Sequence, residues 1–362
     1  MILDILYGLV VWTRNRLYDL RVLSSYKGSL PTIVIGNLAI GGTGKTPHSE
    51  FIVRQLLAEG KHPAILSRGY KRKTKGFLLA NAGSLTSDIG DEAMLLHFRL
   101  PDVPIAVCKD RLEGIEKIKE LCPEVDIVVL DDAMQYRRLQ ADTTILLTRY
   151  NHLYPQDAYL PWGTLRDHKG ESKRAQIIIV TGCPANISEA EKDLICGTLQ
   201  PADNQEVLFS TISYGKPSLL TASVSNIPID SDLRQNENRS QNKNRPQNKN
   251  RSQNKNRPQN EDHSKKITSS LRIGVFAGIA NPQSFVEYVK TTYGKPDIIH
   301  LFSDHHWYSA KDIQFFENAI VSNTIDLWLT TEKDAVRLIN NHHLTPTLQN
   351  KIAYIPIEIK II

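Results

Sequence analysis

Strand-length apolar runs alternate with helical apolar spacing along most of the chain. From residue 31 onward, each short apolar run precedes a segment in which apolar side chains recur every three or four residues. This order predicts strands at 33–35, 64–67, 105–107, 125–130, 144–147 and 177–181, and helices at 49–57, 92–98 and 112–121. The run at 125–130 is apolar except for Asp126, which is typical of a strand buried on both faces of a parallel sheet. The pattern predicts a doubly wound, mostly parallel α/β domain.

The same alternation resumes near the end of the chain. It predicts strands at 272–277, 297–301, 326–330 and 353–357, and helices at 281–291, 310–318 and from 333 onward. We therefore expect a second, smaller α/β lobe. Between the two lobes, residues 235–260 repeat with a period of six (QNENRS, QNKNRP, QNKNRS), without an apolar residue other than two prolines. Such a segment buries too little surface to offset the entropy of ordering, which predicts a disordered linker.

These patterns predict four parts in the chain. They are an N-terminal amphipathic helix at 1–30, a nucleotide-binding core at 31–215, a linker at 216–266 and the smaller lobe at 267–362. The N-terminal apolar stretch, MILDILYGLVVW, is too short to span a bilayer, which takes about 20 residues. One interpretation is a helix on a membrane surface, with Trp12 at the interface and Arg14, Arg16 and Arg21 facing anionic head groups. The other is a helix packed on the protein's own core.

Net charge does not indicate a nucleic-acid partner. The chain of 362 residues carries a formal charge of +5 at pH 7. Residues 235–260 contain seven Lys or Arg and one Glu, a net of +6, so the rest of the chain is left at −1. The predicted folded parts are therefore nearly neutral, and no basic binding face is implied.

Cysteine usage gives no sign of a zinc site or a disulfide framework. The four cysteines are Cys108, Cys122, Cys183 and Cys196, and no C-x-x-C pair occurs. A reducing, cytoplasmic compartment is the natural inference.

The strongest chemical signal is the stretch VIGNLAIGGTGKTP at 34–47. An apolar strand, a glycine-dense loop and a helix follow one another there, as a phosphate-binding loop requires. The helix N-terminus adds positive charge, Lys45 can reach the β- and γ-phosphates, and the Thr46 hydroxyl can ligate Mg²⁺. The strict pattern has a glycine where this chain has Ala39, so we expect Gly41 and Gly42 to make the tight turn. The expected ATP-binding residues are Ala39, Ile40, Gly41, Gly42, Thr43, Gly44, Lys45 and Thr46.

Three further patterns carry possible chemistry. Asp131 and Asp132 end a buried strand, the arrangement that holds Mg²⁺ beside a phosphate loop. Asp91 follows Gly90 at the start of a predicted helix, where it is either a general base or a helix-capping residue. His305 follows Asp304, and an Asp beside a His can fix the ring tautomer, although a solvated loop is the alternative.

Taken together, these motifs resemble the tetraacyldisaccharide 4′-kinase family over the whole chain. The resemblance rests on an ordered set of segments: GNL at 36–38 and GGTGKTP at 41–47, LSRGY at 66–70, GDE at 90–92, DDAMQ at 131–135, LPWGTLR at 160–166, DHH at 304–306 and TEKDA at 331–335. It implies transfer of the γ-phosphate of ATP to the 4′-hydroxyl of a tetraacylated disaccharide 1-phosphate, in lipid A biosynthesis.

The resemblance also implies residue roles. Asp91 matches the family's catalytic aspartate and His305 its partner, while Thr46, Asp131 and Asp132 match the metal site. Arg68, Arg166 and Gln135 match motif residues suited to substrate or phosphate contacts.

The chain departs from the family pattern at several positions. DDAMQ stands where the family usually has DDGFQ, Asp167 stands where it often has Glu, and the repeat is not part of the pattern. The first two bear on fine positioning and not on the activity.

An acylated substrate lives in a bilayer, and this favours the membrane-surface interpretation of the N-terminal helix. We expect the Gly8 side and residues 9–12 to enter the leaflet, and a peripheral protein on the cytoplasmic face of the inner membrane, with no protein partner implied. Two alternatives stay open. One is a GTPase or nucleotide switch, although TEKD at 331–334 only approximates a guanine-binding run, and the other is a soluble kinase of an acyl-free metabolite.

Overall fold

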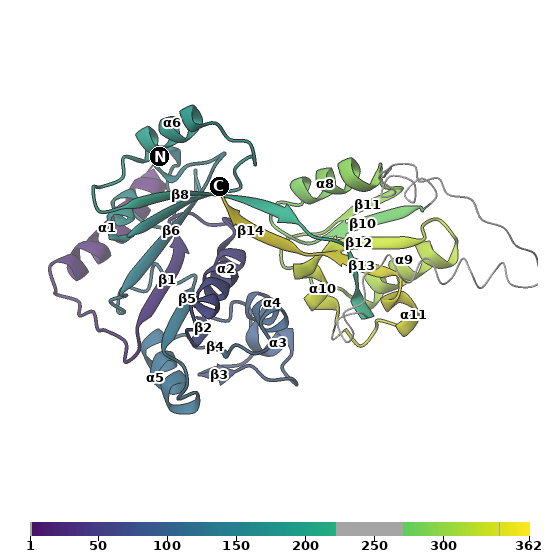
Figure 1. The fold of residues 1–362 in the computed structure, drawn as a ribbon, viewed down its shortest axis with the longest axis horizontal. Coiled ribbons are helices and arrows are strands. Elements are labelled where there is room, and N and C mark those ends of the chain that lie inside the picture. The colour runs from purple at the N-terminus through teal and green to yellow at the C-terminus, as the bar shows by residue number, and fades with distance from the viewer. Residues whose placement is uncertain (1, 222–270, 340) are drawn as a thin grey trace, which may run out of the picture. The chain divides into compact units, whose positions relative to one another are not determined.

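The computed structural model describes residues 2–221, 271–339 and 341–362. The repeat at 235–260, and with it the predicted disorder of the linker, lies outside these residues. The chain divides into two compact units, one of Met1–Tyr214 with Ile357–Ile362 and the other of Gly215–Pro356 (Figure 1).

A largely parallel sheet forms the centre of the first unit. Within the described residues, its strands run in the order β14-β8-β7-β6-β1-β5-β2-β4-β3, with β3 and β14 antiparallel at the two edges. The strands are β1 Thr32–Asn37, β2 Pro63–Ser67, β3 Leu78–Leu79, β4 Ile105–Val107, β5 Ile127–Asp131, β6 Thr143–Arg149, β7 Ile177–Thr181, β8 Glu206–Tyr214 and β14 Ile357–Ile361. The inner strands are buried and mostly apolar along their middles because both faces of the sheet are covered. The predicted doubly wound α/β fold is confirmed.

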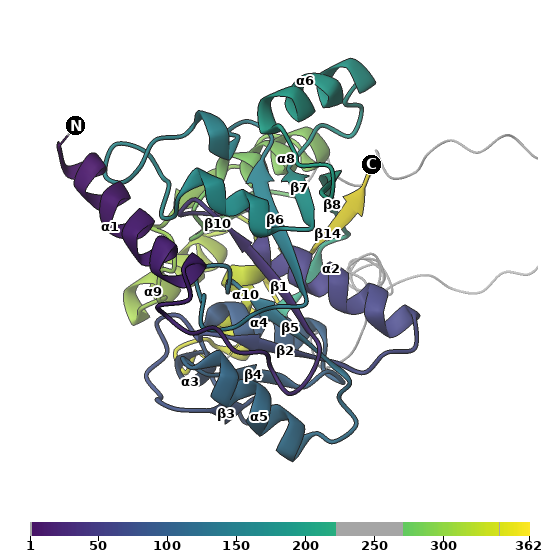
Figure 2. The same ribbon diagram turned by 90° about the vertical axis from the view of Figure 1, so that its left-hand side faces the viewer.

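Helices cover both faces of this sheet, and Figure 2 shows them around it in a second view. They are α1 Ile2–Asp19, α2 Lys45–Ala58, α3 Thr86–Ile89, α4 Asp91–Arg99, α5 Arg111–Leu121 and α6 Glu189–Leu199, with the 3-10 turns η1 Tyr154–Gln156 and η2 Lys169–Arg174. α2 packs over β1, β2 and β5. The side chains of α5 join the cluster formed by the alternate strand residues Val34, Leu66 and Val128. Period-two alternation along the strands thus divides the apolar residues between two helical layers.

The position of the last strand differs from the sequence prediction. The apolar run predicted as one strand at 353–357 is divided by Pro356 into β13, Ile352–Ile355, and β14. Proline cannot donate a ladder hydrogen bond, so it ends β13. β14 then pairs antiparallel with β8 in the first unit. Residues 357–362 therefore belong to the first unit and not to the smaller lobe in which 267–362 was placed.

The second unit is a smaller α/β layer structure. Its sheet has the order β11-β10-β12-β13-β9 within the described residues, with only β9 antiparallel. Its other elements are β9 Ser218–Leu219, β10 Ile273–Ala277, α8 Gln283–Tyr293, β11 Ile298–Leu301, α9 Ala310–Val321, β12 Leu327–Thr331, α10 Glu332–Leu338 and α11 Pro346–Gln349. Phe276 and Phe316 stack in its core, and Trp328 packs edge-on against both rings. The Trp328 indole N–H donates to the Phe316 carbonyl at 3.1 Å.

A buried histidine joins the start of α2 to β8. His48 Nδ1 lies 2.7 Å from the carbonyl oxygen of Gly44 and Nε2 lies 2.9 Å from Ser210 Oγ. A carbonyl only accepts, so Nδ1 carries the proton and Nε2 accepts from the serine. Burial lowers the pKa of His48 to about 4, although the hydrogen bond to Gly44 opposes the shift. The ring is therefore neutral in the folded protein near pH 7.

We expect His48 to make the folded protein sensitive to acid. Above pH 6.5 the ring is neutral in both states, whereas between pH 6.5 and about 4 only the unfolded chain binds the proton. Stability from this residue is thus lost as pH falls through that window, by at most about 3 kcal/mol. Urea unfolding of wild type and His48→Gln at pH 7.5, 6 and 5 measures the effect. The variant should lose less stability than wild type, with exposed His62→Gln as control; parallel losses would contradict the assignment.

Candidate functional site

The phosphate-loop segment joins β1 to α2 through two glycines in the left-handed region. Gly41 has φ 98° and Gly44 has φ 78°, and Gly44 caps α2. Such angles strain any residue with a Cβ. Gly41 therefore makes the turn as predicted, whereas Gly42 has no positive φ. Ala39 does not need a left-handed backbone, so its Cβ causes no strain. The residue is buried and forms an isolated β-bridge with Leu165.

Side chains and backbone fix the rest of this loop. Asn37 Nδ2 donates to Thr43 Oγ1 at 2.8 Å, and the Ile40 N–H donates to the Thr164 carbonyl at 2.7 Å. The segment LPWGTLR thus holds one side of the loop. α2 begins at Lys45, so the partial positive charge of its N-terminus lies beside the loop.

Parallel pairing brings the two strongest motifs together. β1 and β5 are neighbours with Ile35 opposite Asp131, so their carboxyl ends lie at the same edge of the sheet. Thr46 Oγ1 lies 3.3 Å from Asp131 Oδ2, and Lys45 Nζ lies 3.9 Å from Asp132 Oδ2. The predicted cluster of Lys45, Thr46, Asp131 and Asp132 is therefore formed in the structure.

Asp132 lies among several positively charged side chains. It has a left-handed backbone, φ 51°, a conformation that Asp adopts more readily than most residues. Its carboxylate forms an ion pair with Arg166, with one contact at 3.3 Å from Nη1 to Oδ2. Burial alone raises the pKa of Asp132, but the charges of Lys45, Arg166 and Arg111 outweigh it and lower the pKa. Asp132 therefore stays ionised and keeps the cations in place.

Asp131 has the opposite electrostatic environment. It is fully buried, and burial, followed by the charges of Glu92 and Asp132, raises its pKa to about 7. A hydrogen bond from Ser49 Oγ at 2.9 Å and the charge of Lys45 oppose the shift. A buried carboxylate with too little positive charge around it is suited to a cation.

These residues fit Mg²⁺. The ion prefers oxygen ligands and usually binds one or two protein groups together with nucleotide phosphates and water. Thr46 and Asp131 supply two such oxygens. In the part of the chain that the structure describes, no group of three or more His, Cys, Asp or Glu side chains could hold a metal ion. The described residues therefore contain no metal site made of protein side chains alone. A Mg²⁺ site that nucleotide phosphates complete would need only Thr46 and Asp131 from the protein.

Sequence reasoning missed Arg111, the first residue of α5. Its side chain is 4% exposed, and its Nε–H has no hydrogen-bond partner among the described residues. The same is true of Arg166 Nε. A buried donor without an acceptor needs an explanation, and a phosphate oxygen is an acceptor of the right charge. Its position could have indicated a role in the site, because Arg111 lies four residues after the end of β4 and directly follows Asp110, which caps α5.

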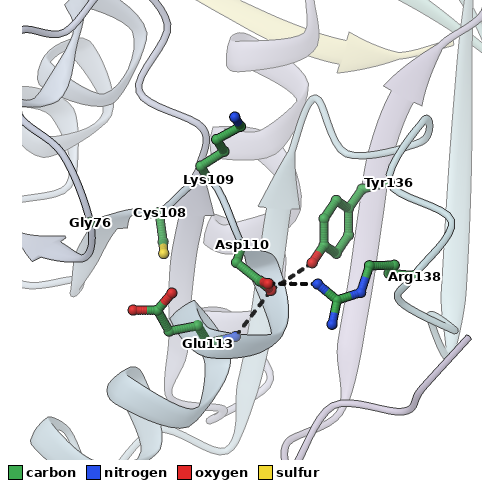
Figure 3. Close-up of a pocket in the computed structure, with 7 residues that line it drawn as sticks. All are labelled: Gly76, Cys108, Lys109, Asp110, Glu113, Tyr136 and Arg138. Atoms are coloured by element: carbon green, nitrogen blue, oxygen red, sulfur yellow. Dashed lines mark hydrogen bonds and ion pairs between the residues drawn. The ribbon is translucent and has the colours of Figure 1, made fainter.

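A hollow of about 390 Å³ lies at the start of α5 (Figure 3). It is lined by Gly76, Cys108, Lys109, Asp110, Glu113, Tyr136 and Arg138. Asp110 caps α5 and also accepts from Tyr136 Oη at 2.6 Å and Arg138 Nη1 at 2.7 Å. With these partners Asp110 fixes the start of α5, and the Arg111 guanidinium lies over the Tyr136 ring at 5.5 Å. The hollow contains none of the predicted site residues.

The remaining predicted phosphate contacts occupy different surroundings. Gln135 Nε2 donates to the Asn37 carbonyl at 2.7 Å, so this amide supports the end of β1. Arg68 is exposed at the end of β2, close enough to Arg111 for the charge of Arg68 to lower the pKa of Arg111, after burial. Arg68 thus adds to the same positive region.

Asp91 and His305 lie in different units. Asp91 is buried at the start of α4, next to Glu92, whose charge reaches Asp131. His305 has φ 60°, its N–H donates to the Gly278 carbonyl at 3.2 Å, and its Nε2 lies 3.6 Å from Asp304 Oδ2. The partnership of Asp91 with His305 stays a prediction.

The TEKD segment forms part of the buried hydrogen-bond network of the second unit. Asp334 is fully buried, with Oδ2 accepting from the Gly278 N–H at 3.0 Å and from Thr331 Oγ1 at 2.6 Å. Its Oδ1 accepts from Tyr308 Oη and Arg337 Nη1, both at 2.9 Å. Asp334 is fully engaged in this network, which argues against a guanine-binding role and supports the turn that carries His305.

One face of the helix α1 packs on the protein's own core, and membrane contact through its exposed face stays a prediction. Val11 and Asn15 are buried against the protein, whereas Leu9, Val10 and Trp12 are exposed. The expectation for the Gly8 side is wrong, because Gly8 packs against the Tyr159 ring. Arg14 was expected to face head groups, but its Nη2 lies 3.6 Å from Asp167 Oδ2 within the protein. Among the described helices, none is both long and apolar enough to cross a membrane.

Comparison with known proteins identifies the family. The profile of the family Tetraacyldisaccharide-1-P 4′-kinase matches residues 1–361. The chain belongs to this kinase family. A tetraacyldisaccharide 4′-kinase of Bacteroides thetaiotaomicron is 37% identical over 99% of this chain and 87% of its own length. One from Flavobacterium johnsoniae is 35% identical over 98% of this chain and 89% of its own.

A solved structure of the tetraacyldisaccharide 4′-kinase fold supports the architecture. LpxK from Aquifex aeolicus, in a crystal structure in complex with ATP, superposes with a TM-score of 0.70. It is 23% identical, and the match covers 99% of this chain and 93% of that one. At this identity the likeness supports the fold alone.

Arg111 provides a test of the site that the sequence did not anticipate. We expect Arg111→Met to slow phosphate transfer by on the order of 10²-fold, because one preorganised charge would be lost from the phosphate region. Radiolabelled ATP and detergent-dispersed tetraacyldisaccharide 1-phosphate give the rate. Lys117→Met, which removes an exposed cation from the same helix, serves as the matched control. A rate for Arg111→Met equal to that of the control would exclude Arg111 from the site.

Proposed function

We propose that this chain transfers the γ-phosphate of ATP to the 4′-hydroxyl of tetraacyldisaccharide 1-phosphate, as a step of lipid A biosynthesis. The observation that carries the proposal is the cluster of Lys45, Thr46, Asp131 and Asp132 at the carboxyl ends of β1 and β5. Membership of the kinase family supplies the reaction, and the cluster supplies the site at which ATP is held.

The cations of the cluster support phosphate transfer electrostatically. Lys45 and Arg166 form ion pairs with Asp132, and the charge of Arg111 also acts on it. Preorganised charge stabilises a transferring phosphoryl group without further reorganisation. Thr46 and Asp131 are the residues that would hold Mg²⁺, which offsets charge on the phosphates when bound. Arg68 and Gln135 complete the set proposed to contact substrate or phosphate.

Asp91 is proposed as the base that accepts the proton of the sugar hydroxyl, with His305 as its partner. Its carboxyl group lies at the N-terminus of α4, where a helix presents partial positive charge. His305 lies on a turn held by the buried Asp334 network and faces Asp304 within ion-pair distance. An aspartate base with a histidine partner can pass the proton of an acceptor hydroxyl to solvent.

The exposed face of α1 is proposed to rest on the membrane that holds the substrate. Val10 is 68% exposed, and Leu9 and Trp12 are exposed beside it. An apolar face with an interfacial Trp and nearby basic residues is typical of a helix that lies in a membrane surface. ATP is available on the cytoplasmic side, which favours the cytoplasmic face of the inner membrane as the site of action.

Asp91 is tested by removing its charge. We expect Asp91→Asn to lower kcat by about 10²–10⁴-fold, the usual effect of losing a positioned base, with ATP affinity nearly unchanged. His305→Gln should also lower kcat, and the double variant should be no slower than Asp91→Asn because the two act as one pair. The rates come from labelled ATP transfer in micelles. Wild-type turnover in Asp91→Asn would remove the residue from the reaction.

Membrane contact is tested with vesicles. Replacing both Val10 and Trp12 by Ser should weaken flotation with anionic vesicles by roughly tenfold or more, given the free energy of burying two large apolar side chains. Leu57→Ser removes an exposed apolar residue from α2 and should leave flotation unchanged. Equal flotation of all three proteins would count against the proposed face.

A further inference from the structure

A buried polar contact ties α1 to the residue that follows Arg166. Asn15, on the protein-facing side of α1, is 2% exposed, and its Nδ2 donates to Asp167 Oδ1 at 2.7 Å. Asp167 is completely buried, and its Oδ1 also accepts from the His168 N–H at 2.9 Å. A buried carboxylate depends on such donors, because burial of an uncompensated charge is costly.

Two further contacts connect the same helix to the same segment. Tyr7 Oη donates to the carbonyl oxygen of Arg166 at 3.1 Å. Arg14 Nη2 lies 3.6 Å from Asp167 Oδ2 and donates to Asn15 Oδ1 at 2.9 Å. Residues from three positions along α1 thus contact Arg166 or Asp167.

The opposite side of this segment is attached to the nucleotide loop. The N–H groups of Arg166 and Asp167 both donate to the Leu38 carbonyl, at 2.8 and 3.2 Å. The Arg166 side chain donates to Asn37 Oδ1 at 2.6 Å and pairs with Asp132. The segment therefore lies between α1 and the phosphate loop.

A second connection reaches the site through Arg137. Its Nη1 donates to the Asn15 carbonyl at 3.1 Å and its Nη2 to Asp19 Oδ1 at 2.7 Å. Arg137 follows Gln135 by two residues, and it also lies 3.2 Å from Glu171. α1 therefore contacts the segment that carries Arg166, a partner of Asp132, and also the segment that follows Asp132 in the chain.

We propose that α1 is a positioning element for Arg166, with Asn15 acting through Asp167 to hold the guanidinium against Asp132. The proposal rests on the role proposed above for Arg166. Asn15 is buried against Asp167, so we expect it to affect the reaction only through the position of Arg166. The lipid-facing residues Leu9, Val10 and Trp12 lie on the same 18-residue helix, so membrane contact and Arg166 share one rigid element.

The central experiment places a like charge against Asp167. Asn15→Asp replaces the donor by a second buried carboxylate, which should displace the segment. A displacement of about 1 Å at a positioned group can cost on the order of 10²-fold in rate, so we expect kcat to fall by about 10- to 100-fold. Thr13→Asp adds the same charge on the exposed side of α1 and should leave the micellar rate unchanged.

Rescue and coupling separate positioning from a purely structural role. The exchanged pair Asn15→Asp with Asp167→Asn restores one donor and one carboxylate and should recover most of the rate. In an Arg166→Ala background, Asn15→Asp should have no further effect on kcat, since it acts through the missing side chain. Tyr7→Phe, which removes only a hydroxyl, gives an independent and milder variant; its rate should fall by about two- to fivefold.

The outcomes distinguish the inference from the function on which it rests. Full activity of Arg166→Ala would overturn the role of Arg166 and the inference together. A slow Arg166→Ala with a fully active Asn15→Asp and Tyr7→Phe would overturn the inference alone. Failure of the exchanged pair to recover, together with an additive effect in the Arg166→Ala background, would also overturn it, since α1 would then stabilise the fold without positioning Arg166.

Discussion

The arrangement of the site depends on one carboxylate. Asp132 follows β5 with a left-handed backbone, and its charge attracts Lys45, Arg166 and Arg111. These cations come from α2, from the segment before η2 and from α5, so they would repel one another without it. The neighbouring Asp131 is buried with less compensation, and this difference gives two adjacent aspartates separate roles. The first lies among cations of the protein, and the second is the one proposed to bind a cation from solution.

Much of this organisation follows from the sequence. Apolar runs with the right spacing predict a parallel sheet, and a parallel sheet brings the residues after its neighbouring strands to one edge. Lys45, Thr46 and the two aspartates could therefore be expected together before their distances were known. The sequence also predicts that Ala39 can replace the usual glycine, because nearby glycines can adopt the left-handed backbone angles.

Other parts of the site depend on tertiary contacts that no local pattern reveals. Arg111 sits in an ordinary amphipathic helix, and only folding shows that it is buried beside Tyr136. Arg14 is indistinguishable in sequence from Arg16, yet only Arg14 lies beside the buried Asp167. The sequence predicts one strand at 353–357 because apolar residues continue across Pro356. Proline cannot donate a ladder hydrogen bond, so the structure has two strands there. The pattern gave the elements, and long-range hydrogen bonds decided their partners.

The return of β14 to the first sheet affects how the protein is made. β8 and its antiparallel neighbour are separated in the chain by the whole second unit, roughly 140 residues. At about 5–20 residues per second, a ribosome needs on the order of ten seconds to bridge that interval. During this time β8 is an unpaired sheet edge, the kind of surface to which foreign strands add. The nascent chain is therefore most exposed to misassembly after its nucleotide-binding core has already been synthesised.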